Sequence, residues 1–504
     1  MTDVQAEVTD WLSQPATHGG EAPERIDTHI STVFLAGGRV LKLKKAVRLP
    51  FLDFSTLAAR RAACEAELAI NRRAAPQLYL GLRAVTRGPA GLALDGDGEV
   101  VDWLVEMRRF DQDTLFDRLV RRGRLDRNRM VELTEAVAAF HASAPVRPDR
   151  GGAAGLRWTI DTNRTSMRTS DLLPAAQVEE LAEASGAALA RWTARLEERR
   201  EGGLVRQCHG DLHLGNICLF GGKPTLFDAI EFSEDIACVD VAYDLAFLLM
   251  DLDRRGARGL AAYVLNHWLD LTGDFAAVGP MPLFLSLRAG VRAHVSATMA
   301  AHATGPERDR LAEDALAYLE AARGYLAPPP PRLLAVGGLS GSGKSRMGRE
   351  LSPFLAVPGA AVVRSDVLRK HLMGVAIHDR LGPEGYTLEA GERTYDALYD
   401  TCARVLADGH SAVADAVFAK PHQREAIEQV ARRAGVPFDG LWLEAAHEVA
   451  AKRIAKRRAN ASDATVAVLE AQLGYDLGPI AWTRIDTGGP KDAVLAAGRN
   501  ALGV

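Results

Sequence analysis

The sequence predicts two domains of different fold class, an α+β domain at residues 1–327 and an α/β domain at residues 332–504. The first observation is length, because 504 residues exceed what one hydrophobic core usually serves. The second is the proline run 328–331, which can neither continue a helix nor lie centrally in a sheet and so predicts a short spacer. The third is the alternation of strand and helix patterns from Leu333 onward, which predicts a parallel sheet with helices on both faces.

The composition is that of an ordinary soluble globular protein, with 47% hydrophobic and 25% charged residues. A net charge of −4 provides no global basic field for nucleic acid. The five cysteines form no C-x-x-C pair and cannot all be disulfide-bonded, so a reducing cytoplasm is expected. No segment has the pattern of a signal peptide or the length of a membrane span, so no membrane partner is expected.

A glycine-rich segment follows the apolar run 333–336. Residues 338–345 read GLSGSGKS and match the phosphate-binding pattern G-x-x-x-x-G-K-[ST]. Glycines suit such a loop because its backbone N–H groups must approach phosphate oxygens closely, where a Cβ would obstruct them. Lys344 is expected to reach the β- and γ-phosphates and Ser345 to hold Mg²⁺, whereas the alternative is a turn without a ligand. The residues expected to bind nucleotide are Gly338, Ser340, Gly341, Ser342, Gly343, Lys344 and Ser345.

A second nucleotide site, of a different kind, is predicted upstream. Residues 209–216 read HGDLHLGN, so Asp211 lies five residues before Asn216, and Asp228 follows among apolar residues. Protein kinases use this spacing for a catalytic aspartate and two metal-binding residues. Asp211 is therefore expected to accept the proton of a substrate hydroxyl, and Asn216 and Asp228 are expected to bind Mg²⁺.

Two family resemblances rest on these motifs. The HGDLHLGN segment, with FDAIEF at 227–232, resembles the aminoglycoside phosphotransferase and choline kinase group over roughly residues 28–323. Residues 332–504 resemble the AAA-type P-loop kinases grouped with polynucleotide kinase, gluconate kinase and zeta-toxin-like enzymes. The whole chain resembles bacterial fusions of these two types. The resemblance implies a bilobal protein-kinase-like fold joined to a P-loop NTPase domain, with ATP and Mg²⁺ as cofactors.

The N-terminal hairpin is expected to carry the lysine that grips phosphates in a kinase fold. Residues 39–44 alternate as a strand, and Lys42 fits best because the two residues before it resemble the V-A-I-K lead-in. Lys44 shares its face and stays an alternative. The bracing acid on the next helix is Glu67 or Glu65. Such charges are also common on solvated strand edges and helix faces.

The resemblance also implies an adenine-binding hinge. It assigns the hinge to the strand pattern 103–107, with Glu106 and Met107 next to adenine. No G-x-G-x-x-G loop precedes Lys42, so the glycine pair 37–38 is the candidate for the phosphate lid.

The C-terminal domain has a candidate base at a strand end. The strand pattern that begins at residue 361 ends in Asp366, and Arg369 follows three residues later. In the polynucleotide-kinase-like enzymes that this domain resembles, such an aspartate abstracts the acceptor proton and a nearby arginine contacts phosphate or substrate. The alternative is that Asp366 only caps a helix, where aspartate is favoured. Its place at the carboxyl end of a strand favours the base, because α/β folds bind ligands there.

The resemblance assigns two further roles in this domain. The strand pattern 411–415 ends in Asp415, which resembles the Mg²⁺-linked acid of the Walker B position. No glutamate follows it, which argues against a motor or ABC-type ATPase. Arg453 and Arg457 lie four residues apart on a predicted helix and are expected to form a lid over the transferring phosphate. A solvated basic helix and a local RNA-binding patch are the alternatives.

These motifs together predict an ATP-dependent phosphotransferase with two Mg²⁺-nucleotide sites. Its expected acceptor is a hydroxyl group of a small metabolite such as a sugar, an amino sugar or a nucleoside. One alternative is a nucleotide-binding regulator in which one domain is silent. Another is a 5′-hydroxyl polynucleotide kinase in the C-terminal domain, which the net charge of −4 disfavours.

Overall fold

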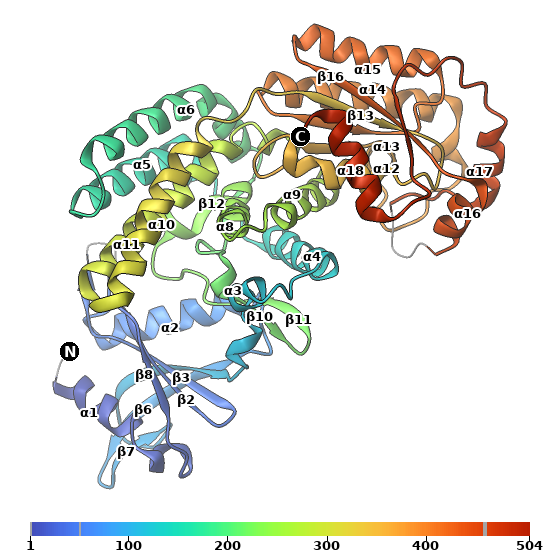
Figure 1. The fold of residues 1–504 in the computed structure, drawn as a ribbon. Coiled ribbons are helices and arrows are strands. Elements are labelled where there is room, and N and C mark those ends of the chain that lie inside the picture. The colour runs from blue at the N-terminus through green and yellow to red at the C-terminus, as the bar shows by residue number, and fades with distance from the viewer. Residues whose placement is uncertain (1–2, 50–51, 457–460) are drawn as a thin grey trace. The chain divides into compact units, whose positions relative to one another are not determined.

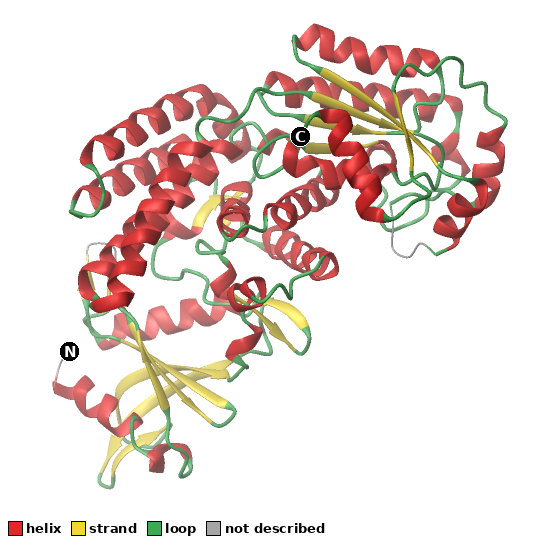
Figure 2. Cartoon of the chain, in the orientation of Figure 1, coloured by secondary structure: helices red, strands yellow, loops and turns green. Residues whose placement is uncertain are grey.

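The structure is a computed structural model that describes residues 3–49, 52–456 and 461–504. Figure 1 shows the course of the chain and Figure 2 its helices and strands. Contacts between Cα atoms divide the chain into two compact units. The first unit consists of Met1–Thr159 and Thr193–Leu248, and the second of Ile160–Trp192 and Leu249–Val504.

The first unit is built on a six-stranded antiparallel sheet with the order β1-β2-β3-β8-β6-β7. Its strands and the two helices beside it are β1 (Glu24–Asp27), β2 (Ser31–Ala36), β3 (Arg39–Lys44), β6 (Tyr79–Gly88), β7 (Gly91–Leu94), β8 (Glu99–Arg108), α1 (Asp3–Leu12) and α2 (Leu57–Asn71). Side chains alternate across a sheet, so β3 contributes Leu41 and Leu43 to the hydrophobic cluster with α1 and Val40 to the cluster with α2. The same alternation places Lys42 and Lys44 on the face that α2 covers.

A short hairpin in this unit separates two of the predicted metal ligands. The remaining elements are β4 (Arg48–Leu49), β5 (Leu52–Asp53), α3 (Phe116–Arg121), α4 (Arg127–Ser143), β9 (Val205–Gln207), β10 (Ile217–Phe220), β11 (Lys223–Leu226), α7 (Glu234–Ala237) and β12 (Cys238–Asp240). Strands β10 and β11 pair antiparallel, so Asn216 directly precedes the hairpin and Asp228 follows its end by two residues. Helices α5 (Gly152–Arg168), α6 (Ala175–Glu201) and α8 (Val241–Arg254) have residues in both units.

The second unit contains a five-stranded sheet with the order β14-β15-β13-β16-β17. Its strands are β13 (Leu333–Gly337), β14 (Ala361–Arg364), β15 (Ala412–Asp415), β16 (Phe438–Glu444) and β17 (Thr483–Asp486). All four neighbouring pairs are parallel, so the predicted parallel sheet is confirmed. The central strand β13 is buried throughout, as expected for a strand covered on both sides.

Helices cover both faces of this sheet (Figure 1). The helices of the unit are α9 (Arg258–Thr272), α10 (Met281–His302), α11 (Gly305–Tyr325), α12 (Lys344–Leu351), α13 (Ser365–Leu372), α14 (Leu388–Ala407), α15 (Pro421–Ala434), α16 (His447–Ala455), α17 (Val466–Leu473) and α18 (Lys491–Leu502). Helices α12 and α18 pack on each other, and α14 packs on α15. Because consecutive parallel strands need a crossover, these helices return the chain to the same sheet edge, where all carboxyl ends meet.

The proline run lies between two elements of the second unit. Helix α11 ends at Tyr325 and β13 begins at Leu333, so residues 328–331 belong to neither. Helices that precede the prolines, among them α9, nevertheless belong to the same compact unit as the parallel sheet. The division of the chain into domains 1–327 and 332–504 stays a prediction. No helix among the described residues is long and apolar enough to cross a membrane.

Candidate active sites

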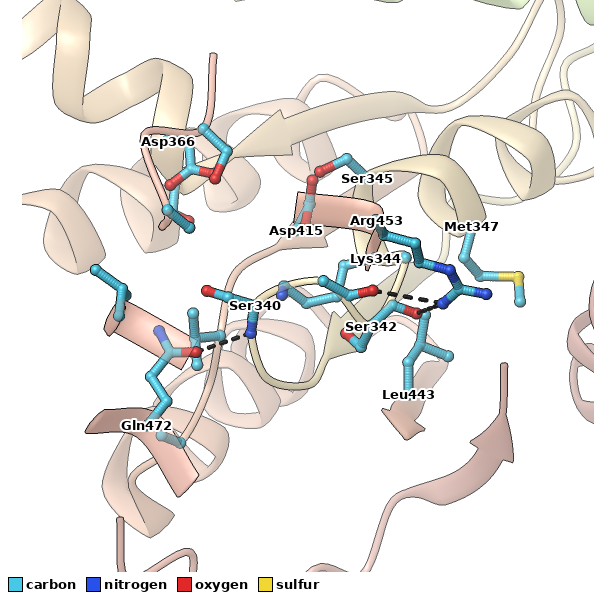
Figure 3. Close-up of a pocket in the computed structure, with 18 of the residues that line it drawn as sticks. Ser340, Ser342, Lys344, Ser345, Met347, Asp366, Asp415, Leu443, Arg453 and Gln472 are labelled. Carbon is cyan, nitrogen blue, oxygen red and sulfur yellow. Dashed lines mark hydrogen bonds between the residues drawn. The ribbon is translucent and has the colours of Figure 1, made fainter. Parts of the chain in front are cut away.

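A cavity of about 1080 Å³ is lined by residues that follow β13, β14 and β15. Figure 3 shows it in close-up. The predicted residues that line it are Ser340, Gly341, Ser342, Gly343, Lys344, Ser345, Asp366, Arg369, Asp415 and Arg453. They come from four separate segments, which the parallel sheet brings to one edge. The volume is just above the range of roughly 300–1,000 Å³ that is typical of small-molecule sites.

The glycine-rich loop has a backbone that other residues could not adopt. Gly338 has φ +137° and Gly341 has φ +82°, in the region that favours glycine. A Cβ on Gly338 would lie 2.4 Å from the carbonyl oxygen of Leu443, and one on Gly341 would lie 2.7 Å from that of Ala450. Gly343, at φ +99°, is the N-cap of α12, so this helix begins at Lys344 and directs its N–H groups toward the loop. The loop is therefore shaped for the close approach of an anion.

One polar group in the loop has no hydrogen-bond partner among the described residues. The Ser342 hydroxyl is buried and unpaired. Such groups are rare in native structures and often mark a ligand that is not shown. The hydroxyl of Ser345 and the carboxylate of Asp415 face each other in Figure 3 and provide the hard oxygen ligands that Mg²⁺ prefers. The residues present thus fit a Mg²⁺-nucleotide.

Neighbouring elements hold the loop in place. The N–H of Ser340 donates to Oε1 of Gln472 on α17, at 2.8 Å. The guanidinium of Arg453 donates to the Thr487 carbonyl at 2.6 Å and to its hydroxyl at 3.0 Å, and it lies 3.4 Å from the Gly341 carbonyl. Arg453 therefore contacts the phosphate-binding loop, and its role as a lid stays a prediction. Arg457 lies outside the described residues, beyond the end of α16 at Ala455.

The two acids predicted to end strands both line the cavity, but only Asp415 ends its strand, because β14 already ends at Arg364. Asp415 is the last residue of β15 and is buried. Asp366 is in the first turn of α13, whose N-cap is Arg364, so the helix-cap alternative does not describe its position. Arg369, one turn later, donates to the Gly385 carbonyl at 2.7 Å and lies over the ring of Tyr386. Roles as base and substrate contact stay predictions for Asp366 and Arg369.

Two charged residues near this cavity were missed by the sequence reasoning. Arg364, the last residue of β14, is buried, with its Nε 3.5 Å from Asp415 and its Nη1 3.0 Å from Asp270. Burial opposes the charge of Arg364, but Asp270, Asp415 and Asp366 outweigh it and raise its pKa above the ordinary value. Arg364 could have been noticed as a charge ending an apolar strand. Asp270 lies far earlier in the chain, and no local pattern marks it.

In the first unit, a chain of alternating charges connects β3 to α2. Nζ of Lys42 lies 2.9 Å from Oε1 of Glu67, and Lys44 donates to the other oxygen of Glu67. Glu67 is fully buried, whereas Glu65 pairs with Arg61 at the surface. Burial raises the pKa of Glu67, but the two lysines outweigh burial and lower it. The structure thus pairs Lys42 with Glu67, and it gives Lys44 a place in the same cluster.

The cluster continues to the predicted metal ligand Asp228. Lys42 also lies 2.6 Å from Asp228, whose carboxylate is half exposed and whose φ is +61°. The N–H of Asp228 donates to the hydroxyl of Tyr79 at 3.0 Å, which holds this unusual backbone. Lys44 donates to Glu231, whose side chain is 4% exposed and to which the sequence reasoning assigned no role. Glu231 could not be assigned because its side-chain direction depends on the turn after Asp228.

Hydrogen bonds within the predicted catalytic loop, and from its backbone to Asp244, hold the loop in place. The side-chain amide of Asn216 donates to Oδ2 of Asp211 and to its carbonyl, at 2.9 Å each. The N–H groups of His209 and Gly210 donate to the buried carboxylate of Asp244, at 3.1 Å and 2.8 Å. Asp211 and Asn216 therefore lie side by side, and Asp244 anchors the backbone that carries them; their roles as base and metal ligand stay predictions.

The predicted hinge residues lie in β8. The backbone of Met107 is in register with Val40 of β3 on one side and Tyr79 of β6 on the other. The carboxylate of Glu106 pairs with Arg39 and Arg83, at 2.6 Å each. A contact of these two residues with adenine stays a prediction.

Two family models match this chain. Residues 34–280 match the family described as "Phosphotransferase enzyme family", and residues 333–475 match the family described as "AAA domain". The protein is therefore an ATP-dependent kinase, in which a phosphotransferase-family domain precedes a P-loop kinase-like domain. Both predicted resemblances and the fold class are confirmed.

The chain is also similar to two uncharacterized mycobacterial proteins. One is from Mycobacterium tuberculosis and one from Mycobacterium bovis, and each is 28% identical over 482 residues, with 92% of both chains covered. Among solved structures, a Mycobacterium tuberculosis APS kinase in complex with AMPPNP and APS has 22% identity and a TM-score of 0.28, covering 35% of this chain and 99% of that chain. A Plasmodium vivax ethanolamine kinase has 11% identity and a TM-score of 0.39, covering 60% of this chain and 84% of that chain.

Proposed function

We propose that the protein transfers the γ-phosphoryl group of Mg²⁺-ATP to a hydroxyl of a small metabolite, and that it does so at two sites. The observation that carries the proposal is the single cavity that joins the glycine-rich loop to Asp366 and Asp415. Phosphoryl transfer needs positioning, charge neutralisation and a proton acceptor, and no covalent intermediate. These residue types supply all three.

At the second-unit site, the loop amides and Lys344 would bind the phosphates. Ser345 and Asp415 would hold Mg²⁺, which supplies positive charge to the transferring group. Asp366 would accept the acceptor hydroxyl proton while the hydroxyl oxygen bonds to the γ-phosphorus. The bond from that phosphorus to the β,γ-bridging oxygen breaks, and ADP leaves with the electron pair.

At the first-unit site, Asp211 would take the same proton and Asn216 with Asp228 would hold Mg²⁺. The pairing of Lys42 with Glu67 supports a nucleotide there, because it directs the ammonium toward the face that carries Asp228. Two complete sets of groups support turnover at both sites rather than a regulator with one silent domain.

A small-molecule acceptor is supported by the lining of the second-unit cavity. Beside the acids it contains the aromatic residues Tyr386, Tyr395 and Tyr475 and the cations Arg369 and Lys420. Aromatic walls with a few convergent polar groups are typical of small-molecule sites. The net charge of −4 does not favour nucleic acid as the acceptor.

The experiment is an ADP-release screen of the full chain against sugars, amino sugars, nucleosides and 5′-hydroxyl oligonucleotides. Lys344→Ala and Asp366→Asn should lower the rate of acceptor-dependent ADP release at the second-unit site by about 100-fold or more. Asp211→Asn should lower the rate at the first-unit site to a similar degree. Glu425→Gln and Asp235→Asn change exposed acids and serve as matched controls. ATP binding without acceptor-dependent ADP from any panel member would contradict the proposal and favour a regulator.

A further inference from the structure

Helix α9 places a buried carboxylate against two arginines of the elements that frame the second-unit cavity. Asp270 lies in its last turn, has a side chain that is 2% exposed, and pairs with two arginines, Arg349 and Arg364. Asp270 lies within the segment that matches the phosphotransferase family, whereas both arginines lie within the segment that matches the AAA domain. All three residues belong to the same compact unit.

Each arginine connects Asp270 to a different part of the phosphate site. Arg349 lies on α12, the helix that starts at Lys344 and Ser345. Arg364 is the last residue of β14, two positions before Asp366, and its Nε is 3.5 Å from Asp415. The Asp270 carboxylate therefore connects α12, which follows the phosphate-binding loop, to the end of β14. That strand end lies near the two acids Asp366 and Asp415.

The charges in this cluster depend on one another. Arg364 is 5% exposed, and a buried guanidinium is costly unless carboxylates compensate it. Besides Asp270, Arg364 pairs with Asp415, a predicted ligand of Mg²⁺. A stronger pairing of Arg364 with Asp415 would compete with the metal for the same oxygen atoms.

We propose that Asp270 is a positioning residue of the second-unit site, which holds Arg364 and Arg349 so that Asp415 and Ser345 stay available to Mg²⁺. This inference rests on the proposed function of that site. It makes a residue of the phosphotransferase-family segment part of the P-loop kinase, so the two family segments are not independent modules joined at the prolines.

A purely structural role of α9 is the competing explanation, and the helix offers a matched control for it. Asn266, one turn before Asp270, donates to the Ala360 carbonyl at 3.0 Å and accepts from the N–H of Val362 at 2.6 Å. Asn266 thus joins α9 to the same strand β14, and none of its hydrogen bonds within the described part of the chain reaches Arg364 or Asp415. Loss of Asn266 should loosen the packing of α9 without changing the charges around the metal ligands.

The test compares Asp270→Asn with Asn266→Ala in the full chain that also carries Lys42→Met, so that the first-unit site contributes little. The measurement is the binding of a fluorescent ADP analogue as a function of Mg²⁺, with melting temperature and steady-state kinetics alongside. Lys344→Ala in the same background identifies the binding that belongs to the P-loop. Asp270→Asn should raise the Mg²⁺ concentration for half-maximal binding by about 10-fold or more, as loss of a group behind a metal ligand does.

Asn266→Ala should lower the melting temperature and leave the Mg²⁺ dependence as in the parent. Asp270→Glu, which keeps the charge, should recover most of the Mg²⁺ affinity. If Asp270→Asn does not fold, Arg364→Lys tests the same arrangement, because it keeps the charge but shortens the reach to Asp270. Equal Mg²⁺ dependence in Asp270→Asn and the parent, or equal shifts in Asp270→Asn and Asn266→Ala, would overturn the inference.

Different experimental results would contradict the proposed function and the positioning role of Asp270. A parent that binds Mg²⁺-ADP but never releases acceptor-dependent ADP would contradict the proposed function, and the binding comparison would still decide the role of Asp270. A parent without any Lys344-dependent nucleotide binding would overturn both.

Discussion

Nζ of Lys42 lies 2.9 Å from Oε1 of the fully buried Glu67, and the same ammonium lies 2.6 Å from the half-exposed Asp228. Lys42 thus bridges the buried carboxylate of Glu67 and the carboxylate of Asp228, which a ligand can reach. Burial lowers the pKa of Lys42, but Asp228 and Glu67 raise it more, so the ammonium stays charged at neutral pH. A permanently charged group at this position suits phosphate binding.

Lys42→Met should remove this charge while keeping much of the side-chain volume. We expect the turnover assigned to Asp211 to fall by about 100-fold, as when one preorganised cation or donor is lost. Lys45→Met is the matched control, because Lys45 is on the same segment but pairs with Asp27. The measurement is acceptor-dependent ADP release in a Lys344→Ala background. Equal activities of the two variants would rule out a role of Lys42 in catalysis.

The Glu67 carboxylate should stabilise the first unit in a pH-dependent manner. Its pKa is lowered from 4.5, because Lys42 and Lys44 outweigh the effect of burial. Unfolded chains take up a proton near pH 4.5 and the folded protein only at lower pH, so the stabilisation is present above pH 4.5 and is lost as pH falls below it. Glu67→Gln should cost about 3 kcal/mol at pH 7, since it leaves two buried lysines undercompensated. Urea denaturation of wild type and variant should show this difference shrinking below pH 4.5; a difference that grows there would contradict the assignment.

Gly338→Ala should damage the phosphate-binding loop. The added Cβ would lie 2.4 Å from the Leu443 carbonyl at a residue with φ +137°, which costs about 1–3 kcal/mol in strain. Nucleotide affinity at the second-unit site should fall accordingly, by about 10-fold or more. Gly391→Ala is the control, because Gly391 lies within α14 with open space around it and should gain about 0.5–1 kcal/mol. The checks are calorimetric nucleotide binding and thermal melting of both variants.

Arg453→Gln distinguishes the two roles that the sequence and the structure suggest for this residue. As a brace of the loop, through Thr487 and the Gly341 carbonyl, Arg453 should mainly affect binding. Loss of charged hydrogen bonds of about 1.5–3 kcal/mol would then weaken nucleotide binding by about 10-fold or more. As a lid over the transferring phosphate, it would lower kcat and leave the nucleotide Kd nearly unchanged. Arg484→Gln, which breaks only an exposed pair with Glu444, is the control.

Local sequence patterns were sufficient to predict much of the fold and those residues of each site that lie within one short motif. The alternation in β3, the glycines of 338–345 and the spacing of Asp211 and Asn216 act within a few residues, so the chain itself dictates their geometry. The parallel sheet followed from alternating strand and helix patterns for the same reason. Asp415, at the end of β15, and Asp366, two residues after the end of β14, then lie at the edge that parallel strands share.

Long-range packing was needed to choose among residues that are alike in sequence. Glu67 rather than Glu65 faces the lysines because only one of the two points into the interior covered by α2. The connection of Asp270 to Arg364 spans 94 positions and exists because α9 packs on β14. A periodic pattern marks which face of a helix is buried, but the partner that meets a buried charge is set by tertiary packing, where charge is too costly to leave uncompensated.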